Sequence, residues 1–410
     1  MSELAPNTDQ KNSAAESMPK KNHGRVSAAQ GWILSIVGFL PIMSIVGLAP
    51  ALPTLMKHFD HLPNVKTLVP LLLTAPGLCV AVLSPFAGYL TDKYGRRPFL
   101  LSAILLYSVG GIVPLFVDHF TTIMTGRLVL GLAQAFIFTI ANVLVADYYS
   151  QEERPKWIAL QGIVGPILGT LLLALTGQLA SIGWQWPFII FAPVFIIFIL
   201  SFFFLFEPIK TQIKTSTITD VSTPVPWNTI GIISIVTLIT SVIYFVYTIH
   251  YGLVLDEIGV KDGALVGRLS AIASIGTPIG AYIYRRNSKY SIKRQFLLVS
   301  FFIGVGLTGV GLIKDYHLNL IAGFVQQLGC GMTIPMLAGW SLGLLPAEHR
   351  GRGMGFWTSC LFVGQFLCPL AVSFARERFG GFQQAFFAFG LLAVFILIVL
   401  LGSMTLHKKK

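Results

Sequence analysis

Twelve long apolar stretches follow one another along the 410-residue chain. Each is about 20 residues or more in length, which is what an α-helix needs to cross the hydrocarbon core of a bilayer. Strands of a membrane barrel would be about half as long and would alternate apolar with polar side chains. The stretches therefore predict an all-α membrane protein with twelve transmembrane helices. Their limits are 29–54, 67–90, 98–117, 121–147, 157–180, 187–206, 227–252, 263–284, 295–313, 318–345, 354–374 and 384–406.

The low charge content excludes a water-soluble globule. Charged residues make up 11% of the chain and apolar residues 54%, whereas soluble domains carry roughly 25% charged residues. The net charge of +12 does not indicate a nucleic-acid-binding protein, because the basic residues do not cluster in one soluble region. We therefore expect the lipid bilayer, and not nucleic acid, to be a partner of this chain.

The basic residues indicate instead how the helices are oriented. If the N-terminus is cytoplasmic, 21 Lys and Arg fall in cytoplasmic segments and six on the other side, while Arg127 and Arg268 lie inside predicted helices. Cytoplasmic loops carry an excess of Lys and Arg, so both termini are predicted to be cytoplasmic. Residues 1–28 and 407–410 are then cytoplasmic tails, the first of them disordered. The first apolar stretch lacks a cleavage site after a short core, which favours a transmembrane helix over a removable signal peptide.

A polar segment divides the chain into two halves. Residues 207–226 are rich in Thr and Ser and close with Pro224 and Pro226, a composition typical of a flexible linker. The two halves also share a short sequence at corresponding positions, since Glu-Glu-Arg follows the fourth predicted helix and Glu-His-Arg follows the tenth. Such repetition occurs in several secondary transporters. We expect two six-helix bundles, 29–206 and 227–406, joined by a cytoplasmic linker.

The loop between the second and third predicted helices carries a distinctive motif, GYLTDKYGRR. Its first glycine permits close helix contact, its second a tight turn, and its aspartate can pair with bases at neighbouring helix ends. The motif resembles the G-x-L-x-D-R/K-x-G-R-R/K signature of the major facilitator superfamily, and every specified position agrees. The candidate conformational-switch residues here are Gly88, Asp92, Gly95, Arg96 and Arg97.

Two further segments resemble the drug/proton antiporters of that superfamily. Arg127 opens an R-x-x-x-G segment in the fourth helix, and Gly165, Pro166 and Gly169 form a G-P-x-x-G segment in the fifth. The second match is partial, because two flanking positions lack the usual glycine. The last three residues join the switch candidates. The resemblance implies the major facilitator fold, with two pseudo-symmetric bundles, in a bacterial inner-membrane transporter that is monomeric, uses no cofactor and is not an enzyme.

In the fold that this resemblance implies, the first, fourth, seventh and tenth helices line a central cavity. On the fourth helix, polar and aromatic residues recur at helical steps on one face, and polar residues in a membrane usually face the bundle interior. The seventh and tenth helices add aromatic walls with polar anchors, which suit planar or cationic amphiphilic ligands. The candidate substrate-binding residues are Arg127, Gln134, Phe138, Asn142, Tyr244, Tyr247, Tyr251, Gln326, Thr333 and Trp340.

Three of these residues have a second interpretation. The Arg127 guanidinium can instead snorkel to the lipid headgroups on the outer side. Tyr251 and Trp340 lie close to predicted helix ends, where aromatic residues form interfacial belts.

No acidic residue lies in the middle of a predicted helix, although the chain has 17 of them. Proton-coupled transporters generally need a titratable group in the membrane. The candidates that remain are Asp147 at the inner end of the fourth helix, His250 in the seventh, and Asp256 and Glu257 beyond its outer end. Each has a structural alternative, such as pairing of Asp147 with Arg154. Protons as the coupling ion therefore follow from the resemblance alone.

The favoured function is secondary active export of small amphiphilic or drug-like molecules in exchange for protons by alternating access. One alternative is a facilitator or symporter that takes up sugars or organic acids, whose carboxylate Arg127 would bind. Another is a lipid-translocating or non-transport membrane protein. No metal site is expected, since the four cysteines lie within apolar stretches and not at ligand spacing.

Overall fold

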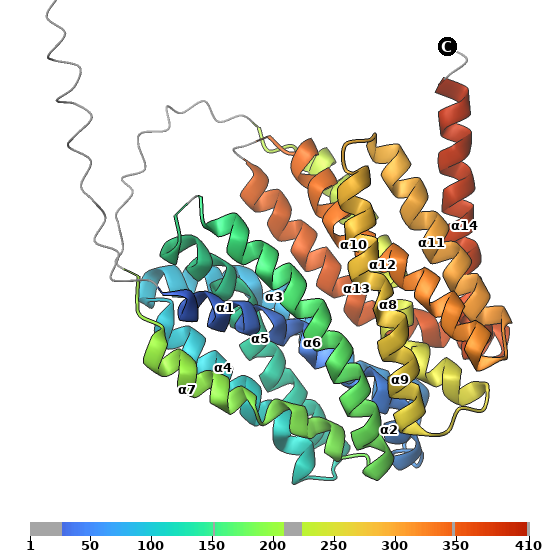
Figure 1. Cartoon of the computed structure of the whole chain (residues 1–410), viewed down its shortest axis with the longest axis horizontal. Coiled ribbons are helices and arrows are strands. Elements are labelled where there is room, and N and C mark those ends of the chain that lie inside the picture. The colour runs from blue at the N-terminus through green and yellow to red at the C-terminus, as the bar shows by residue number, and fades with distance from the viewer. Residues whose placement is uncertain (1–26, 151, 209–223, 347–348, 408–410) are drawn as a thin grey trace, which may run out of the picture.

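The computed structural model describes residues 27–150, 152–208, 224–346 and 349–407. The predicted terminal tails and most of the predicted linker lie outside these residues. Asp92 and Asn142 stand on described helices, but their side chains are likewise outside the described part. Two groups of helices lie beside each other, coloured blue to green and yellow to red in Figure 1.

The first group comprises the elements before residue 207. Helices α3 and α5 pack along each other, α4 packs on α5, and α1 packs on α5 and α6. The elements are α1 (Ala28–Val46), η2 (Ala49–Ala51), α2 (Leu52–His58), α3 (Val65–Tyr94), α4 (Arg97–Ile112), η3 (Val113–Leu115), α5 (Phe120–Tyr148), α6 (Arg154–Ile182), η4 (Trp186–Phe191) and α7 (Val194–Phe204).

The second group repeats this arrangement after residue 226. Helix α11 packs on α12 and α14, α13 packs on α8, and α10 packs on α12. The elements are α8 (Trp227–Glu257), α9 (Gly263–Ser274), α10 (Gly276–Asn287), α11 (Ile292–Leu312), α12 (Tyr316–Leu344), α13 (Arg350–Phe379) and α14 (Phe382–His407).

These helices confirm the predicted fold class. Within the described residues, eleven helical segments are long and apolar enough to span a membrane. The twelfth, in α14, counts as a shorter apolar helix, Phe382–Ile396. The predicted eighth helix is split into α9 and α10. Pro278 explains the break, because it has no N–H to donate to the carbonyl of Ser274.

Several helices are longer than predicted, and in α8 and α13 the added turns change where charged residues lie. Helix α8 continues to Glu257, so Asp256 and Glu257 stand in its last turn and not beyond its end as the sequence suggested. Helix α13 begins at Arg350, four residues before the apolar stretch that predicted it. Arg352 therefore belongs to the first turn of a helix and not to a loop. Apolar stretches mark the part of a helix inside hydrocarbon, whereas helices extend past it.

The two groups meet at one end of the molecule, which we call the closed end. There α6 and α9 touch at glycines, and a side chain on either would collide with backbone. A Cβ on Gly177 would lie 2.6 Å from the Gly263 carbonyl oxygen and 2.8 Å from the Gly267 nitrogen. The hydroxyls of Thr67 on α3 and Ser373 on α13 form a further hydrogen bond between the groups at this end.

The Gly177 contact generates a test of what holds the closed end together. Gly177→Leu cannot be accommodated there, and overpacking of this kind costs about 1–3 kcal/mol. We expect the population to shift by about 5- to 150-fold toward a state in which the groups separate at this end. Spin labels at Lys66 and Phe374, which flank the Thr67–Ser373 contact, should report a longer distance.

The matched control is Gly343→Leu on α12, where a Cβ would meet nothing within 4 Å. It should leave the label distance unchanged. An unchanged distance in a folded Gly177→Leu protein would contradict this account.

Candidate functional site

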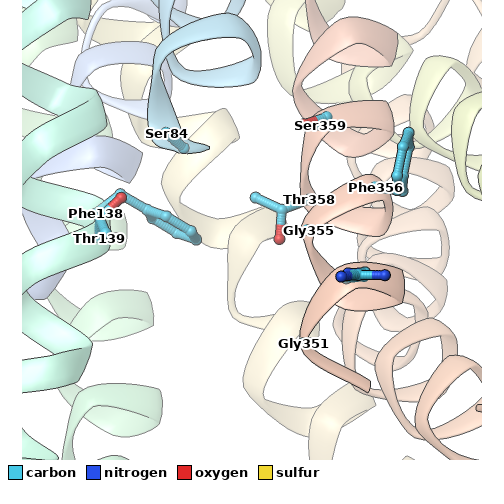
Figure 2. A pocket seen from close by; sticks show the side chains of 9 residues that line it. Ser84, Phe138, Thr139, Gly351, Gly355, Phe356, Thr358 and Ser359 are labelled. Atoms are coloured by element: carbon cyan, nitrogen blue, oxygen red, sulfur yellow. The ribbon is translucent and has the colours of Figure 1, made fainter. Parts of the chain in front are cut away.

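A cavity of about 700 Å³ separates the two groups at the other end of the molecule, which we call the basic end because the Lys- and Arg-rich loops lie there. Figure 2 shows Phe138 and Thr139 on one side and Gly355 and Thr358 on the other, with the Thr358 side chain directed toward Phe138. Phe356 lies on the far side of α13 in this view. The lining residues are Ser84, Phe138, Thr139, Gly351, Arg352, Gly355, Phe356, Thr358 and Ser359.

The wall formed by α13 owes its shape to glycine spacing. Gly351, Gly355 and Thr358 follow at steps of four and three, which places them on one face of a helix. A Cβ on Gly351 or Gly355 would meet nothing within 4 Å, so the missing side chains leave open volume. Toward the closed end, the Phe138 and Phe362 rings pack edge to face, with centroids 5.4 Å apart. This pair lies in a small apolar cluster between the two groups.

The hydroxyl groups of the cavity differ in what they can still bind. Ser84 donates its proton to the Val80 carbonyl and Thr139 to the Ala135 carbonyl, each on its own helix. Ser359 donates across to Ala81 on α3 at 3.1 Å. Because these protons are used, the three hydroxyls offer a ligand mainly acceptor oxygens.

The donors in the cavity are therefore Thr358 and Arg352. Neither side chain has a hydrogen bond or ion pair within the described part of the chain. Among the nine lining residues, Arg352 carries the single charge, and none is acidic. The site can take a molecule with an apolar body and a few polar groups.

The predicted cavity residues of the fourth helix, now α5, lie at different depths. Phe138 lines the cavity. Gln134 is fully buried nearer the closed end, where its amide donates to the Pro41 carbonyl at 3.0 Å and accepts from the Ser44 hydroxyl at 3.2 Å. The side chain of Asn142 lies outside the described residues. The structure thus brings Phe138 to this cavity and holds Gln134 against α1.

Arg127 is also fully buried, so its guanidinium does not reach the surface. Its Nε donates to the Leu72 carbonyl at 2.8 Å and its Nη2 to the Ser44 carbonyl at 2.7 Å. Residue 76, four positions after Leu72, is a proline without an N–H. The Leu48 N–H, four positions after Ser44, bonds to Ile45 instead. Arg127 therefore binds two carbonyls that lack their usual helical partners, and its Nη1 has no partner among the described residues.

Most of the predicted residues of the seventh and tenth helices lie in a separate, largely buried cluster between α8 and α12. The rings of Tyr247 and Tyr251 stack with centroids 4.3 Å apart, and both hydroxyls lack a hydrogen-bond partner in the described residues. The Gln326 amide donates to Cys330 Sγ at 3.1 Å, and that thiol faces the Tyr244 carbonyl at 3.8 Å. None of these residues lines the cavity at the basic end.

The side chains of Thr333 and Trp340 on α12 make other contacts. The Thr333 hydroxyl donates to the Gly329 carbonyl of its own helix at 2.8 Å. The Trp340 ring packs edge to face on Phe296 of α11, with centroids 5.6 Å apart. Both contacts lie within the second helix group.

Two of the proton-coupling candidates lie within their helices. His250 is buried on α8, with Nδ1 3.3 Å from the Val246 carbonyl and its ring stacked on Phe382. Asp147, near the end of α5, forms an ion pair with Arg96, and not with Arg154 as one interpretation of the sequence had it.

The other two candidates stand at the end of α8. A carboxylate oxygen of Asp256 lies 3.1 Å from the Lys261 ammonium. The Glu257 carboxylate accepts from the Gln383 backbone N–H at 2.9 Å and so joins α8 to α14.

The loop motif of the first group is held by a residue that the sequence interpretation assigned to the linker. The Glu207 carboxylate accepts from the backbone N–H groups of Arg96 and Arg97 at 2.8 and 2.7 Å. Carboxylates are favourable at helix N-termini, where backbone N–H groups lack helical partners. Gly95 has φ of +108°, a region that favours glycine, and its turn leads into this contact.

The arginine side chains of the motif are bound within the same group. Besides the Arg96–Asp147 pair, Arg97 donates to the carbonyls of Leu205 and Phe202 at 2.7 and 2.6 Å, at the end of α7. The loop after α3 is thereby fastened to α5 and α7.

The remaining switch candidates are helix-contact positions. A Cβ on Gly88 would have Thr139 of α5 at 3.9 Å, and Gly165 and Gly169 face Phe39 of α1. Pro166 lies inside α6. The glycine motif of the fifth predicted helix thus packs α6 on α1.

The sequence interpretation missed most of the cavity wall, above all Arg352 and Thr358. It treated Arg352 as a loop cation, because the apolar stretch begins after it. A usable signal was present in the Gly351, Gly355 and Thr358 spacing, which continues the helical pattern upstream of that stretch. Glu207 gave no comparable signal, because its contact with α4 joins residues about 110 positions apart.

The sequence matches the profile of the Major Facilitator Superfamily over residues 32–324 and 315–410. It is 26% identical over 299 residues to the tetracycline resistance protein, class B, of Escherichia coli, covering 71% of this chain and 65% of that protein. It is 22% identical over 352 residues to the quinolone resistance protein NorA of Staphylococcus aureus, covering 82% and 87%. The chain thus spans less than two thirds of the length of the first of these relatives.

A solved structure with a similar fold is that of the nucleoside transporter NupG. Its TM-score is 0.74 at 11% sequence identity, with 91% of this chain and 99% of that chain covered. At this identity the likeness concerns the fold alone.

The environment of Arg127 generates a prediction about stability. Arg127→Ala would leave two buried carbonyls without partners, and each such group costs about 1–3 kcal/mol. We expect a loss of about 3 kcal/mol in the free energy of unfolding, measured by thermal or denaturant unfolding in detergent. Arg127→Lys should recover only part of it, because an ammonium lacks the planar fork of a guanidinium.

Arg268→Ala is the matched control. Arg268 also lies within a helix, but its side chain is exposed: it donates to the Ala264 carbonyl of the same helix and forms an exposed ion pair with Asp262, with the two atoms 3.9 Å apart. Its loss should change stability by less than about 0.5 kcal/mol. Equal stability of the Arg127→Ala and wild-type proteins would disprove the clamping role.

Proposed function

Because the chain belongs to the Major Facilitator Superfamily, we propose that it is a secondary active exporter of small amphiphilic molecules. It acts as a monomer by alternating access, with protons as the coupling ion. The curated relatives named above are resistance proteins, which supports export.

The observation that carries this proposal is that the two helix groups are in contact at one end of the molecule and separated by a cavity at the other. The helix groups are joined by the glycine contact at the closed end, and a cavity lies between them at the basic end. By the excess of Lys and Arg, the basic end faces the cytoplasm. Both termini then lie in the cytoplasm, and the membrane is the bacterial inner membrane. This conformation is the one in which an exporter accepts its substrate.

The cavity composition supports a small, partly apolar substrate. Its volume of about 700 Å³ falls in the range of drug-sized binding sites, roughly 300–1,000 Å³. Phe138 provides an apolar surface, while the hydroxyls provide polar anchors. We assign the predicted residues deeper in the two groups, from Arg127 and Gln134 to the Tyr247–Tyr251 stack, to later stages of the substrate path, when the closed end opens.

Coupling to protons requires a group that exchanges a proton as the two ends alternate. Among the candidates, Asp147 is best placed, since its partner Arg96 belongs to the loop motif that the resemblance links to switching. His250, Asp256 and Glu257 are the other proposed sites. Glu257 joins α8 to α14, so its protonation would loosen a contact within the second group.

Asp92 of the loop motif is proposed to bind the second group when the basic end closes. Asp92→Asn removes the negative charge that such a contact needs. We expect near-normal membrane insertion, measured by expression and reporter fusions, together with transport reduced by at least tenfold. Wild-type transport by Asp92→Asn would exclude the gating role.

Export is tested with everted inner-membrane vesicles and a panel of aromatic amphiphiles that carry positive, negative or no charge. Accumulation that an uncoupler abolishes is expected for at least one of them. Gly355→Leu should abolish it, because the new side chain projects into the open cavity. Gly231→Leu on α8 is the control, since a Cβ there also meets nothing within 4 Å but the residue does not line the cavity.

Two outcomes would contradict the proposal. Uptake by right-side-out vesicles, without accumulation in everted ones, would indicate an importer. Equal activity of Gly355→Leu and wild-type protein would show that the cavity is not on the substrate path.

A further inference from the structure

The charge of the cavity points to a narrower class of substrate. Resting on the proposed function, we propose that the cavity selects amphiphiles with an acidic group, and that Arg352 is the residue that recognises this group. The sequence pattern suggested planar or cationic ligands, so this inference changes the expected sign of the substrate charge.

The first step of the argument is that Arg352 differs from the arginines around it. At the basic end, Arg96 is paired with Asp147 and Arg97 is bound to two carbonyls of the α7 segment. Arg350, two residues before Arg352, donates to the Leu345 carbonyl at 3.3 Å. Within the described residues, Arg352 has no such partner, and it lines the cavity. Its charge is therefore available to a ligand.

The second step concerns what the other lining residues can bind. Ser84, Thr139 and Ser359 already donate their protons to backbone carbonyls. Donors for an oxygen-rich group come from Arg352 and from Thr358, whose side chain is directed across the cavity in Figure 2. No lining residue is acidic, so a cationic ligand would meet one positive charge and no negative charge.

The third step is the geometry of recognition. A guanidinium presents a planar fork of N–H donors that matches the two oxygens of a carboxylate. A cleft with low-dielectric walls strengthens the field of a single charge, and Phe138 offers an apolar surface to the rest of the molecule. A charge-assisted hydrogen bond at such a site corresponds to about a tenfold gain in affinity.

The test compares three probes with the same aromatic body: naphthalene-2-carboxylate, the uncharged naphthalene-2-carboxamide and 2-naphthylmethylammonium. Equilibrium dialysis against full-length protein in nanodiscs of uncharged lipid gives their affinities. We expect the carboxylate to bind about tenfold more tightly than the amide, and the ammonium to bind most weakly. The preference should shrink as salt is added, because exposed charges are screened.

Two variants assign the preference to one residue. Arg352→Gln should lower the affinity for the carboxylate to that for the amide and leave the amide unchanged. Arg350→Gln is the matched control and should keep the preference, because Arg350 is bound to Leu345. Arg352→Lys should retain part of it, as a positive charge without the fork.

Several outcomes would overturn the inference. They are equal affinities of the three probes in the wild-type protein, no binding of the carboxylate at millimolar concentration, or an equal loss for all three probes in Arg352→Gln. The last would assign Arg352 to closure of the basic end. Export is measured separately in everted vesicles. A carboxylate preference without export would contradict the proposed function alone, whereas export without a charge preference would contradict this inference alone.

Discussion

Backbone hydrogen bonding inside hydrocarbon is the constraint on which the rest of this structure depends. With no water in the bilayer core, each backbone N–H and C=O must find a partner within the protein, and long helices satisfy most of them. Proline and helix breaks leave exceptions. At two of these exceptions the bare carbonyls of Leu72 and Ser44 receive the Arg127 guanidinium. Burial of the Arg127 charge is costly by itself, but it supplies hydrogen-bond donors to backbone carbonyls of α3 and α1.

The same constraint shapes the contact between the two groups. Where α6 and α9 meet, Gly177 and Gly267 let the backbones approach without side chains between them. Small residues serve this purpose in membranes, where apolar side chains gain nothing by leaving lipid for one another. A contact built on glycine is close but has few interlocking side chains, which suits the alternating access that we propose. At the opposite end, the two groups are separated by the cavity.

The sequence permitted prediction of the helices and their order, because apolar length is a local property. It also permitted prediction of Phe138 as a cavity residue, since helical spacing placed it on a face with other distinctive side chains. It failed where helices extend beyond hydrocarbon. Arg352 lies just before the predicted apolar stretch and Thr358 lies just inside it. The apolar pattern that located this helix therefore missed the polar residues of its first turns. The sequence also did not predict how deeply each side chain lies in the protein. Arg127 and Phe138 share one face of α5, yet Arg127 is fully buried and Phe138 lines the cavity.

Glu207 fixes where the first group ends. Its carboxylate is bound to the start of α4, so residue 207 belongs to the first group and not to the segment that joins the two groups. About 19 residues lie between it and Trp227, where α8 starts, and a chain of this length can reach at most roughly 65 Å, more than twice the thickness of the hydrocarbon core. The length of chain between Glu207 and α8 therefore sets only a wide upper limit on the distance between the two groups.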